Sequence, residues 1–125
     1  MNQRIILLIS AISGMLAVAL GAFGAHALKP ILVENGRELT YDLASRYHFY
    51  HTFALLVVGI LYKKYGIKLR VSAWGFIVGM LFSVSLYIYA ITNQTIFVTL
   101  TPFGGVAFIV GWFSMSWEIY KDKAG

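Results

Sequence analysis

The chain alternates long apolar runs with short polar connections. Three runs, at residues 5–28, 71–91 and 102–117, hold no Asp, Glu, Lys or Arg, and a fourth follows an amphipathic opening within residues 40–62. Each is close to the roughly 20 residues that a helix needs to cross about 30 Å of hydrocarbon. We therefore predict an all-α fold, a four-helix transmembrane bundle with helices at about residues 5–28, 41–62, 71–91 and 102–120.

Composition supports this reading and limits the chain to one domain. Hydrophobic residues make up 59% of the sequence and charged residues 12%, against roughly 45–50% and about 25% in soluble domains. Residues 1–125 are expected to form a single polytopic membrane domain. The first run also follows a basic residue, Arg4, but it exceeds the 7–15 apolar residues typical of a signal peptide, so we expect a retained helix.

The distribution of basic residues predicts how the chain is threaded. The N-terminus, the second connection and the C-terminal tail carry seven of the ten Lys and Arg residues. Basic connections tend to stay in the cytoplasm, so both termini are expected there, in a multi-pass protein of the cytoplasmic (inner) membrane. The net charge of +5 then reflects topology and contact with membrane lipids, and we expect no nucleic-acid partner.

Small residues recur at helical spacing in three of the four runs. Such stripes let helix backbones approach closely in lipid, where packing drives association. They predict that the first and fourth helices pack through small-residue faces, and they are compatible with a homo-oligomer. The predicted packing residues are Ala17, Gly21, Gly24, Gly75, Gly79, Gly104, Gly105 and Gly111.

Polar residues within or beside the runs are few, and the predicted threading brings them toward the outer face. On the second helix, Arg46 and Tyr50 continue a row from Asp42, while Tyr47 and His51 form an adjoining row at the same spacing. Arg46 is expected either to pair with Asp42 or to hold an anionic group. The predicted polar cluster comprises His26, Arg46, Tyr47, Tyr50, His51, Ser83, Ser85, Tyr87 and Thr101.

The residue types in the apolar runs argue against proton coupling, nucleophilic catalysis and metal binding. Carboxylates inside a membrane are the usual groups for proton or cation coupling, and the four apolar runs, before Lys29 and from Tyr47 onward, contain none. No G-x-S-x-G elbow occurs, and no acid lies in a span to orient a catalytic base. Cysteine is absent and only three histidines are present, which is a weak basis for a metal site. We expect no enzyme activity, metal or cofactor; His26 and His51 remain open as structural, ligand-binding or proton-binding residues.

Four segments resemble a known family. They are GAFGAHALK at 21–29, RYHFYHTFALL at 46–56, GMLFSVSLY at 79–87 and TPFGGVAFIVGW at 101–112. They resemble the bacterial membrane proteins called domain of unknown function 423, with YgdD-like and YwdK-like members and a eukaryotic relative, transmembrane protein 256. The resemblance implies a small four-helix membrane protein without a settled activity. His48 and Tyr50 stand where relatives often have Gln or Met, which argues against a role for His48 and against a three-histidine metal site.

The expected function is non-enzymatic. We predict a small membrane protein whose polar cluster near the outer face binds a lipid, another small-molecule ligand or a protein partner. The alternative is a passive channel or uniporter, formed by the bundle or a homo-oligomer, with His26 and His51 lining the path. A channel requires a continuous polar lane, whereas the inner halves of the helices offer almost only Leu, Ile, Val and Phe.

Overall fold

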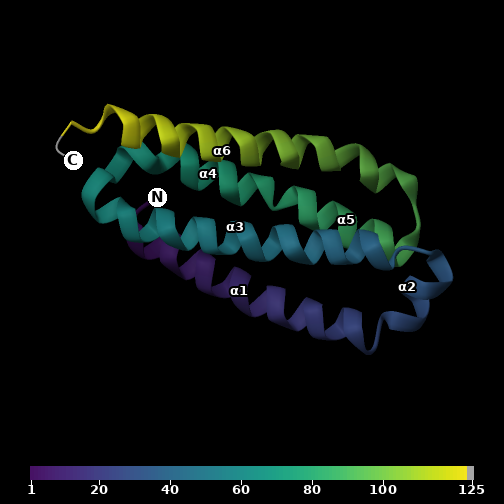
Figure 1. The fold of residues 1–125 in the computed structure, drawn as a ribbon. Coiled ribbons are helices and arrows are strands. Elements are labelled where there is room, and N and C mark those ends of the chain that lie inside the picture. Colours follow the sequence, from purple (N-terminus) through teal and green to yellow (C-terminus); the bar gives the residue numbers. More distant parts are fainter. Residues whose placement is uncertain (124–125) are drawn as a thin grey trace.

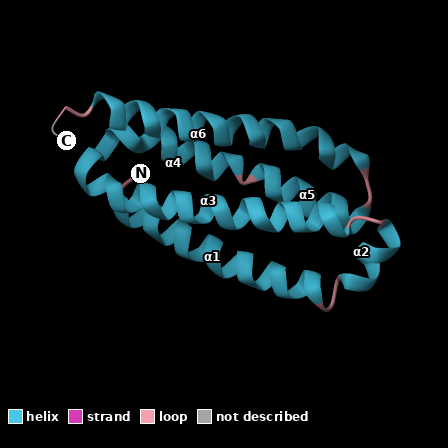
Figure 2. Cartoon of the chain, viewed as in Figure 1, coloured by secondary structure: helices cyan, strands magenta, loops and turns pink. Residues whose placement is uncertain are grey.

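The computed structural model describes residues 1–123, which fold into helices joined by short turns (Figures 1 and 2). The elements in chain order are α1 (Gln3–Ala25), α2 (Lys29–Asn35), α3 (Glu38–Tyr65), the 3₁₀ helix η1 (Gly66–Leu69), α4 (Arg70–Gly79), α5 (Leu81–Thr92), the 3₁₀ helix η2 (Thr95–Leu100) and α6 (Thr101–Lys121). α4 and α5 continue one another across an interruption at Met80 and together form one long helical segment. We call each of the four long helical segments, α1, α3, α4–α5 and α6, a leg of the bundle. The prediction of an all-α, four-helix bundle is confirmed.

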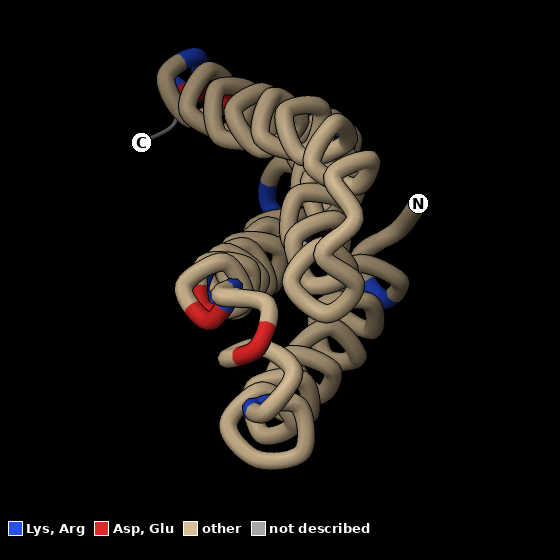
Figure 3. Tube along the Cα trace, turned by 90° about the vertical axis from the view of Figure 1, so that its right-hand side faces the viewer, with Lys and Arg blue, Asp and Glu red and all other residues tan. Residues whose placement is uncertain are grey.

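Three stretches of the described chain are long and apolar enough to cross a membrane: Gln3–Ala25, Glu38–Thr92 and Thr95–Lys121. The second holds 55 residues and doubles back at η1, so it supplies two antiparallel legs (Figure 1). Asp, Glu, Lys and Arg occur only at residue 4 and within residues 29–46, 63–70 and 118–123, so the long stretches between these segments carry no charge. Figure 3 looks along the bundle and marks the charged positions on the chain trace. The structure thus has four legs of membrane-spanning length.

The legs follow one another in the order α1, α3, α4–α5, α6 (Figure 1). α1 packs mainly on α3, α3 packs on α5 and α4, and α6 packs mainly on α4 and α5. α1 and α6 therefore lie at opposite ends of this order. Both present small residues to a neighbour, but the neighbours are α3 and α4.

Several of these helix contacts are too close for any side chain larger than hydrogen. A Cβ added at Gly75 would lie 2.7 Å from the Gly111 Cα, and one at Gly104 would lie 2.2 Å from the Phe82 backbone nitrogen. Ala17 is fully buried in the α1–α3 contact region. Gly21 and Gly105 have more room, because their nearest neighbours would be 3.9 and 3.7 Å from an added Cβ. Small residues thus set the distance between α4 and α6.

Contacts at one end of the bundle join both termini to the last turns of α3, just before η1. The Gln3 side-chain amide donates to the Gly59 carbonyl oxygen over 2.9 Å, and the Tyr62 hydroxyl donates to the Met1 carbonyl oxygen over 3.2 Å. Lys64 lies 3.1 Å from a carboxylate oxygen of Asp122. Both ends of the described chain therefore lie on the same side of the bundle.

The opposite end is closed by a short helix that the apolar pattern did not predict. Pro30 lies in the first turn of α2, where its missing N–H costs no hydrogen bond. Gly36 ends α2 in the left-handed conformation (φ 66°), which glycine adopts without a steric penalty. The Asn35 side-chain amide then donates to the carbonyl oxygens of Ala90 and Ile91, both at 3.0 Å. α2 is thereby held against the end of α5.

Some helix boundaries differ from those expected. α3 begins at Glu38, before the predicted residue 41, and the charge of Glu38 suits the positive end of the helix. Thr101 is the first residue of α6 and Pro102 follows within its first turn. α1 ends at Ala25, before the predicted residue 28, and the backbone N–H of His26 caps it.

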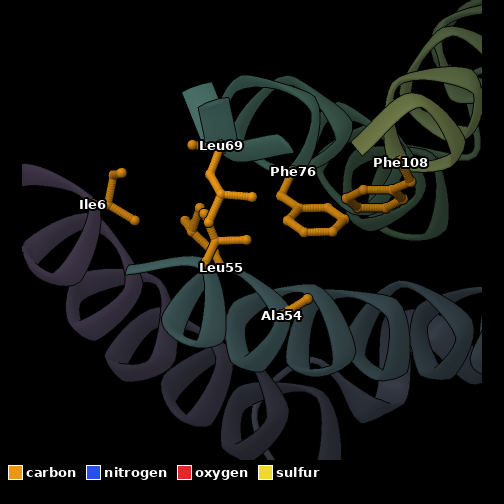
Figure 4. Close-up of a cluster of buried hydrophobic side chains, with 8 residues drawn as sticks. Ile6, Ala54, Leu55, Leu69, Phe76 and Phe108 are labelled. Carbon is orange, nitrogen blue, oxygen red and sulfur yellow. The ribbon is translucent and has the colours of Figure 1, made fainter. Parts of the chain in front are cut away.

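Two buried apolar clusters fill the bundle. One joins α1, α3, η1, α4 and α6 and is drawn in Figure 4; its members are Ile6, Ala54, Leu55, Val58, Leu69, Ala73, Phe76 and Phe108. The other lies toward the α2 end and comprises Leu32, Tyr41, Ala44, Leu86, Tyr87 and Ala90. Tyr87, a member of the second cluster, also takes part in a side-chain hydrogen bond to another helix.

Candidate functional site

A chain of hydrogen bonds connects three legs near the middle of the bundle. The Ser13 hydroxyl on α1 lies 2.6 Å from Thr52 Oγ1 and 3.1 Å from His48 Nε2, both on α3. The other ring nitrogen, His48 Nδ1, lies 3.0 Å from the Tyr87 hydroxyl on α5. A neutral imidazole has one donor and one acceptor nitrogen, so both are used within this chain. His48, Thr52 and Tyr87 are all buried.

A cavity of about 320 Å³ lies beside this chain of hydrogen bonds. We call it the serine groove; it is lined by Ile9, Ile12, Ser13, Leu16, Leu20, His48, Leu55, Ile77, Met80, Ser83, Val84 and Tyr87. Ile12 and Leu16 on α1 and Val84 on α5 are 46%, 47% and 47% exposed, so the groove is open between these two helices. No residue of its lining is Asp, Glu, Lys or Arg.

Both ends of the serine groove are closed by packed side chains. Ile9, Ile77 and Met80 pack against the apolar cluster of Figure 4. At the other end, Leu20 packs against the cluster near α2, of which Tyr87 is itself a member. The groove is therefore open sideways, on the surface that faces lipid, and closed toward both ends of the bundle.

Ser83 is the polar residue of the serine groove whose hydrogen-bonding capacity is unused. Its hydroxyl is buried, with the residue 1% exposed, and has no hydrogen-bond partner in the structure. It follows the interruption between α4 and α5 at Met80. An unsatisfied buried hydroxyl costs about 1–3 kcal/mol, and a hydrogen-bonding group in the groove would remove that cost.

Ser72 supplies a comparison on the same leg. Its hydroxyl is also buried without a partner, but Ser72 lines none of the four cavities described in this section. A shallow apolar depression between α4 and α6 passes nearby, lined by Arg70, Val71, Trp74, Gly75, Val78, Ala107 and Val110. Ser83 thus differs from Ser72 in lining a cavity.

His51 lies on α3 and faces α6. Its Nδ1 lies 2.8 Å from the Tyr47 carbonyl oxygen, which can only accept, and its Nε2 lies 3.0 Å from Trp112 Nε1, which can only donate. These two partners fix a neutral imidazole with its proton on Nδ1. The ring also stacks on Phe108, with centroids 3.5 Å apart and planes 9° from parallel. His51 is thus fully engaged in joining α3 to α6.

A second groove lies over this histidine. It has a volume of about 550 Å³ and is lined by Tyr47, Tyr50, His51, Gly105, Phe108, Ile109 and Trp112. We call it the aromatic groove. Both nitrogens of His51 are already used, so the aromatic groove offers mainly ring faces to a neighbour.

The remaining predicted polar residues lie elsewhere. His26 is exposed at the end of α1 and lines neither groove. Arg46 forms an ion pair with Asp42 (Nε to Oδ2, 3.0 Å) in which both side chains are more than half exposed. Ser85 bonds Thr101 (2.7 Å) and joins α5 to the start of α6. The nine predicted residues therefore do not form one cluster, and three of them, His51, Tyr47 and Tyr50, line the aromatic groove.

The structure also gives roles to residues that the sequence analysis did not select. Ser13 is in neither the predicted polar cluster nor the predicted packing residues, and the resemblance argues against a role for His48. Thr52 was not considered at all. The available signal was spacing: His48 and Thr52 are four residues apart on one face of a helix, and Ser13 is the polar member of a small-residue stripe that packs on that helix.

A polar pocket of about 280 Å³ lies at the α2 end, lined by Gly21, Gly24, Ala25, Lys29, Leu32, Glu38, Tyr41, Asp42 and Ser45. The Tyr41 hydroxyl beside it donates to the Leu20 carbonyl oxygen. Over residues 1–123, no three His, Asp or Glu side chains are placed so that they could hold a metal ion.

Comparison with known proteins places these features in a family of membrane proteins. The chain is 39% identical over 113 residues to the UPF0382 membrane protein YwdK of Bacillus subtilis (88% of this chain, 91% of the relative). It is 36% identical over 121 residues to the UPF0382 inner membrane protein YgdD of Escherichia coli (90% and 86%). A UPF0382 membrane protein of Haemophilus influenzae is 37% identical over 116 residues (91% and 92%).

No solved structure shows significant similarity to the chain. The relatives are named as membrane proteins, and this chain has four apolar legs. It is therefore a multi-pass membrane protein. The family model described as protein of unknown function DUF423 matches residues 20–105, which include three of the four segments that suggested the resemblance and part of the fourth. The chain therefore belongs to the DUF423 family.

Proposed function

We propose that the protein binds a small, uncharged, largely apolar molecule from the bilayer in the serine groove, without transforming it. The observation that carries the proposal is the buried, unpartnered hydroxyl of Ser83 in the lining of an otherwise apolar groove. Ligand sites are typically apolar cavities of about 300–1,000 Å³ with a few polar groups that fix orientation. The serine groove is at the lower end of that range.

The shape of the groove supports a ligand that arrives through lipid. Its rim residues on α1 and α5 are about half exposed, while both of its ends are closed by packed apolar clusters. A water-soluble solute would have no direct path from either end. A molecule already dissolved in the hydrocarbon can enter sideways.

The same packing weighs against a passive channel. A water-filled path would have to cross the cluster that contains Leu55, Val58 and Phe76, each fully buried. His26 and His51, the residues expected to line such a path, do not adjoin one cavity. We therefore favour binding over conduction.

We further propose that the protein lies in the cytoplasmic membrane with both termini inside the cell. Seven of the ten Lys and Arg residues belong to the N-terminus, the η1 connection and the C-terminal tail. The contacts of Met1 with Tyr62 and of Lys64 with Asp122 bring these segments to one end of the bundle. Basic segments on one side favour the cytoplasm.

The binding proposal is tested by asking what the purified protein retains. The wild type would be extracted in mild detergent, and its bound apolar molecules would be identified by mass spectrometry after solvent extraction. Val84→Trp places an indole at the rim of the groove and should abolish retention. Val106→Trp is the matched control, because Val106 is 59% exposed on α6 and lines none of the cavities described above.

The outcomes separate binding from non-specific association with lipid. One molecule per protein in the wild type and Val106→Trp, and none in Val84→Trp, would support the proposal. Identical extracts from all three proteins would refute it. A liposome flux assay on the same samples would revive the channel alternative if the wild type conducted a solute above empty vesicles.

A further inference from the structure

We infer that the ligand of the serine groove is an uncharged carbonyl compound of the bilayer interior, of the isoprenoid quinone class, whose carbonyl oxygen accepts a hydrogen bond from Ser83. This inference rests on the proposed binding function and specifies its ligand.

Depth excludes ordinary lipid head groups. Ser83 lies 13 residues from Arg70 and nine from Thr92 on its leg, which at 1.5 Å per residue is about 20 Å and about 14 Å from the two ends. Ser13 is similarly central in α1 (Gln3–Ala25). Half the hydrocarbon thickness is about 15 Å, so these groups lie near the middle of the bilayer. The ester carbonyls of glycerolipids remain at its surface.

The lining excludes charged ligands. None of the groove residues is Asp, Glu, Lys or Arg, and both nitrogens of His48 are engaged by Ser13 and Tyr87. A carboxylate or ammonium group there would be buried without a counter-ion, which is prohibitively costly in an apolar medium. A ligand of this groove is therefore neutral.

The hydrogen-bond count favours a carbonyl over an alcohol. Ser13 and Tyr87 each bond one ring nitrogen of His48, and the Ser83 hydroxyl is the polar group of the lining without a partner, so it is the group left to serve a ligand. A carbonyl oxygen accepts the one free proton and leaves no donor unsatisfied. An alcohol brings a second proton, which would need a further acceptor in the groove.

The size of the groove favours a compact head with an external tail. The groove has a volume of about 320 Å³, which suits a small ring, while the open rim between Leu16 and Val84 lets an aliphatic tail continue into the lipid. A ring carbonyl on an apolar tail, resident in the bilayer interior, is the chemistry of an isoprenoid quinone. The inference concerns binding, and no electron transfer is included.

The test uses decylubiquinone as the probe and the full chain in dodecyl maltoside. Probe retained after gel filtration is quantified by chromatography, and the shift in unfolding temperature is recorded in parallel. We expect saturable retention of about one probe per protein and a rise in unfolding temperature. Decylubiquinol, which carries hydroxyls in place of the ring carbonyls, should bind at least tenfold more weakly to the same wild-type protein.

Two serine variants separate a ligand contact from a structural effect. Ser83→Ala should weaken decylubiquinone binding at least tenfold, whereas Ser72→Ala should bind like the wild type. Both substitutions remove a buried hydroxyl that lacks a partner, so both proteins should fold. Equal binding by the wild type and Ser83→Ala would overturn the inference. Equal binding of quinone and quinol would do the same without relying on any variant.

Failure of the inference can be told from failure of the proposed function. If decylubiquinone is not retained but the wild type carries a native apolar molecule that Val84→Trp lacks, the quinone class is wrong and the binding function stands. If neither the probe nor any native molecule is retained through the groove, both are wrong.

Discussion

Trp112 donates its indole N–H to His51 Nε2 across the interface of α6 and α3, over 3.0 Å. The opposite ring nitrogen is held by the Tyr47 carbonyl oxygen at 2.8 Å. A second proton on His51 would face the Trp112 N–H, donor against donor, so protonation requires this contact to break. Of the structural, ligand-binding and proton-binding roles that the sequence leaves open for His51, this geometry favours the structural one.

The first prediction concerns the strength of this contact. Trp112→Phe should destabilise the protein by about 1–3 kcal/mol, because it leaves a buried acceptor unpaired. In a double-mutant cycle with His51→Phe, the coupling energy should be about 0.6 kcal/mol and at most about 1.7 kcal/mol, the mean and the maximum found for hydrogen bonds between membrane helices. Unfolding in mixed micelles, followed by circular dichroism, provides the measurement. A coupling energy of zero within error would show that the bond contributes nothing.

The second prediction compares two neighbouring glycines of α6. Gly104→Ala should destabilise the bundle by about 1–3 kcal/mol or more, because the new Cβ would lie 2.2 Å from the Phe82 backbone nitrogen and must force α6 away from α5. Gly105→Ala is the matched control. Its Cβ would lie 3.7 Å from the Phe82 ring, an ordinary contact, so stability should be unchanged or slightly higher.

Thermal unfolding of the two variants under identical conditions distinguishes them. Equal stability of Gly104→Ala and Gly105→Ala would mean that α5 and α6 are not as close as described.

The four membrane-crossing legs were predictable because length and hydropathy alone decide whether a segment can span a bilayer. The order in which the legs pack was not. In lipid, side chains that face a neighbouring helix and those that face acyl chains are equally apolar, so the pattern does not mark the buried face. Gly75, for example, is recognisable from the sequence as a packing residue, but the sequence does not indicate that Gly111 on α6 is its partner.

The candidate site was predicted less completely. Tyr87 and Ser83 were selected because polar groups within spans are costly, and the serine groove contains both. The resemblance argues against a role for His48, but in the structure its ring contacts Ser13 and Tyr87 on two other legs. Contacts between residues so far apart in the chain cannot be predicted from the residues around His48. The interruption of the helix at Met80, three residues before Ser83, likewise could not be predicted, because residues 70–92 contain no proline.

The third prediction concerns Arg46, for which the sequence allowed either an ion pair or an anion site. The pair with Asp42 is present and more than half exposed on both sides, and such pairs contribute about 0–1 kcal/mol. Arg46→Ala should therefore change the free energy of unfolding by less than about 1 kcal/mol, and the molecule retained in the serine groove should be the same as in the wild type. Loss of that molecule in Arg46→Ala would assign binding to Arg46 instead.

The fourth prediction concerns orientation in the membrane. The sequence holds no native cysteine, so single cysteines introduced at exposed turns report sidedness without background. Gln94 lies in the turn between α5 and η2 and Lys68 in η1, at opposite ends of the bundle (Figure 1). The basic η1 side should face the cytoplasm. In intact cells, a membrane-impermeant maleimide should then label Gln94→Cys and spare Lys68→Cys, and both should react after the membrane is permeabilised. The reverse pattern would invert the topology while leaving the serine groove unaffected, because that groove opens to lipid between α1 and α5 and not toward either aqueous side.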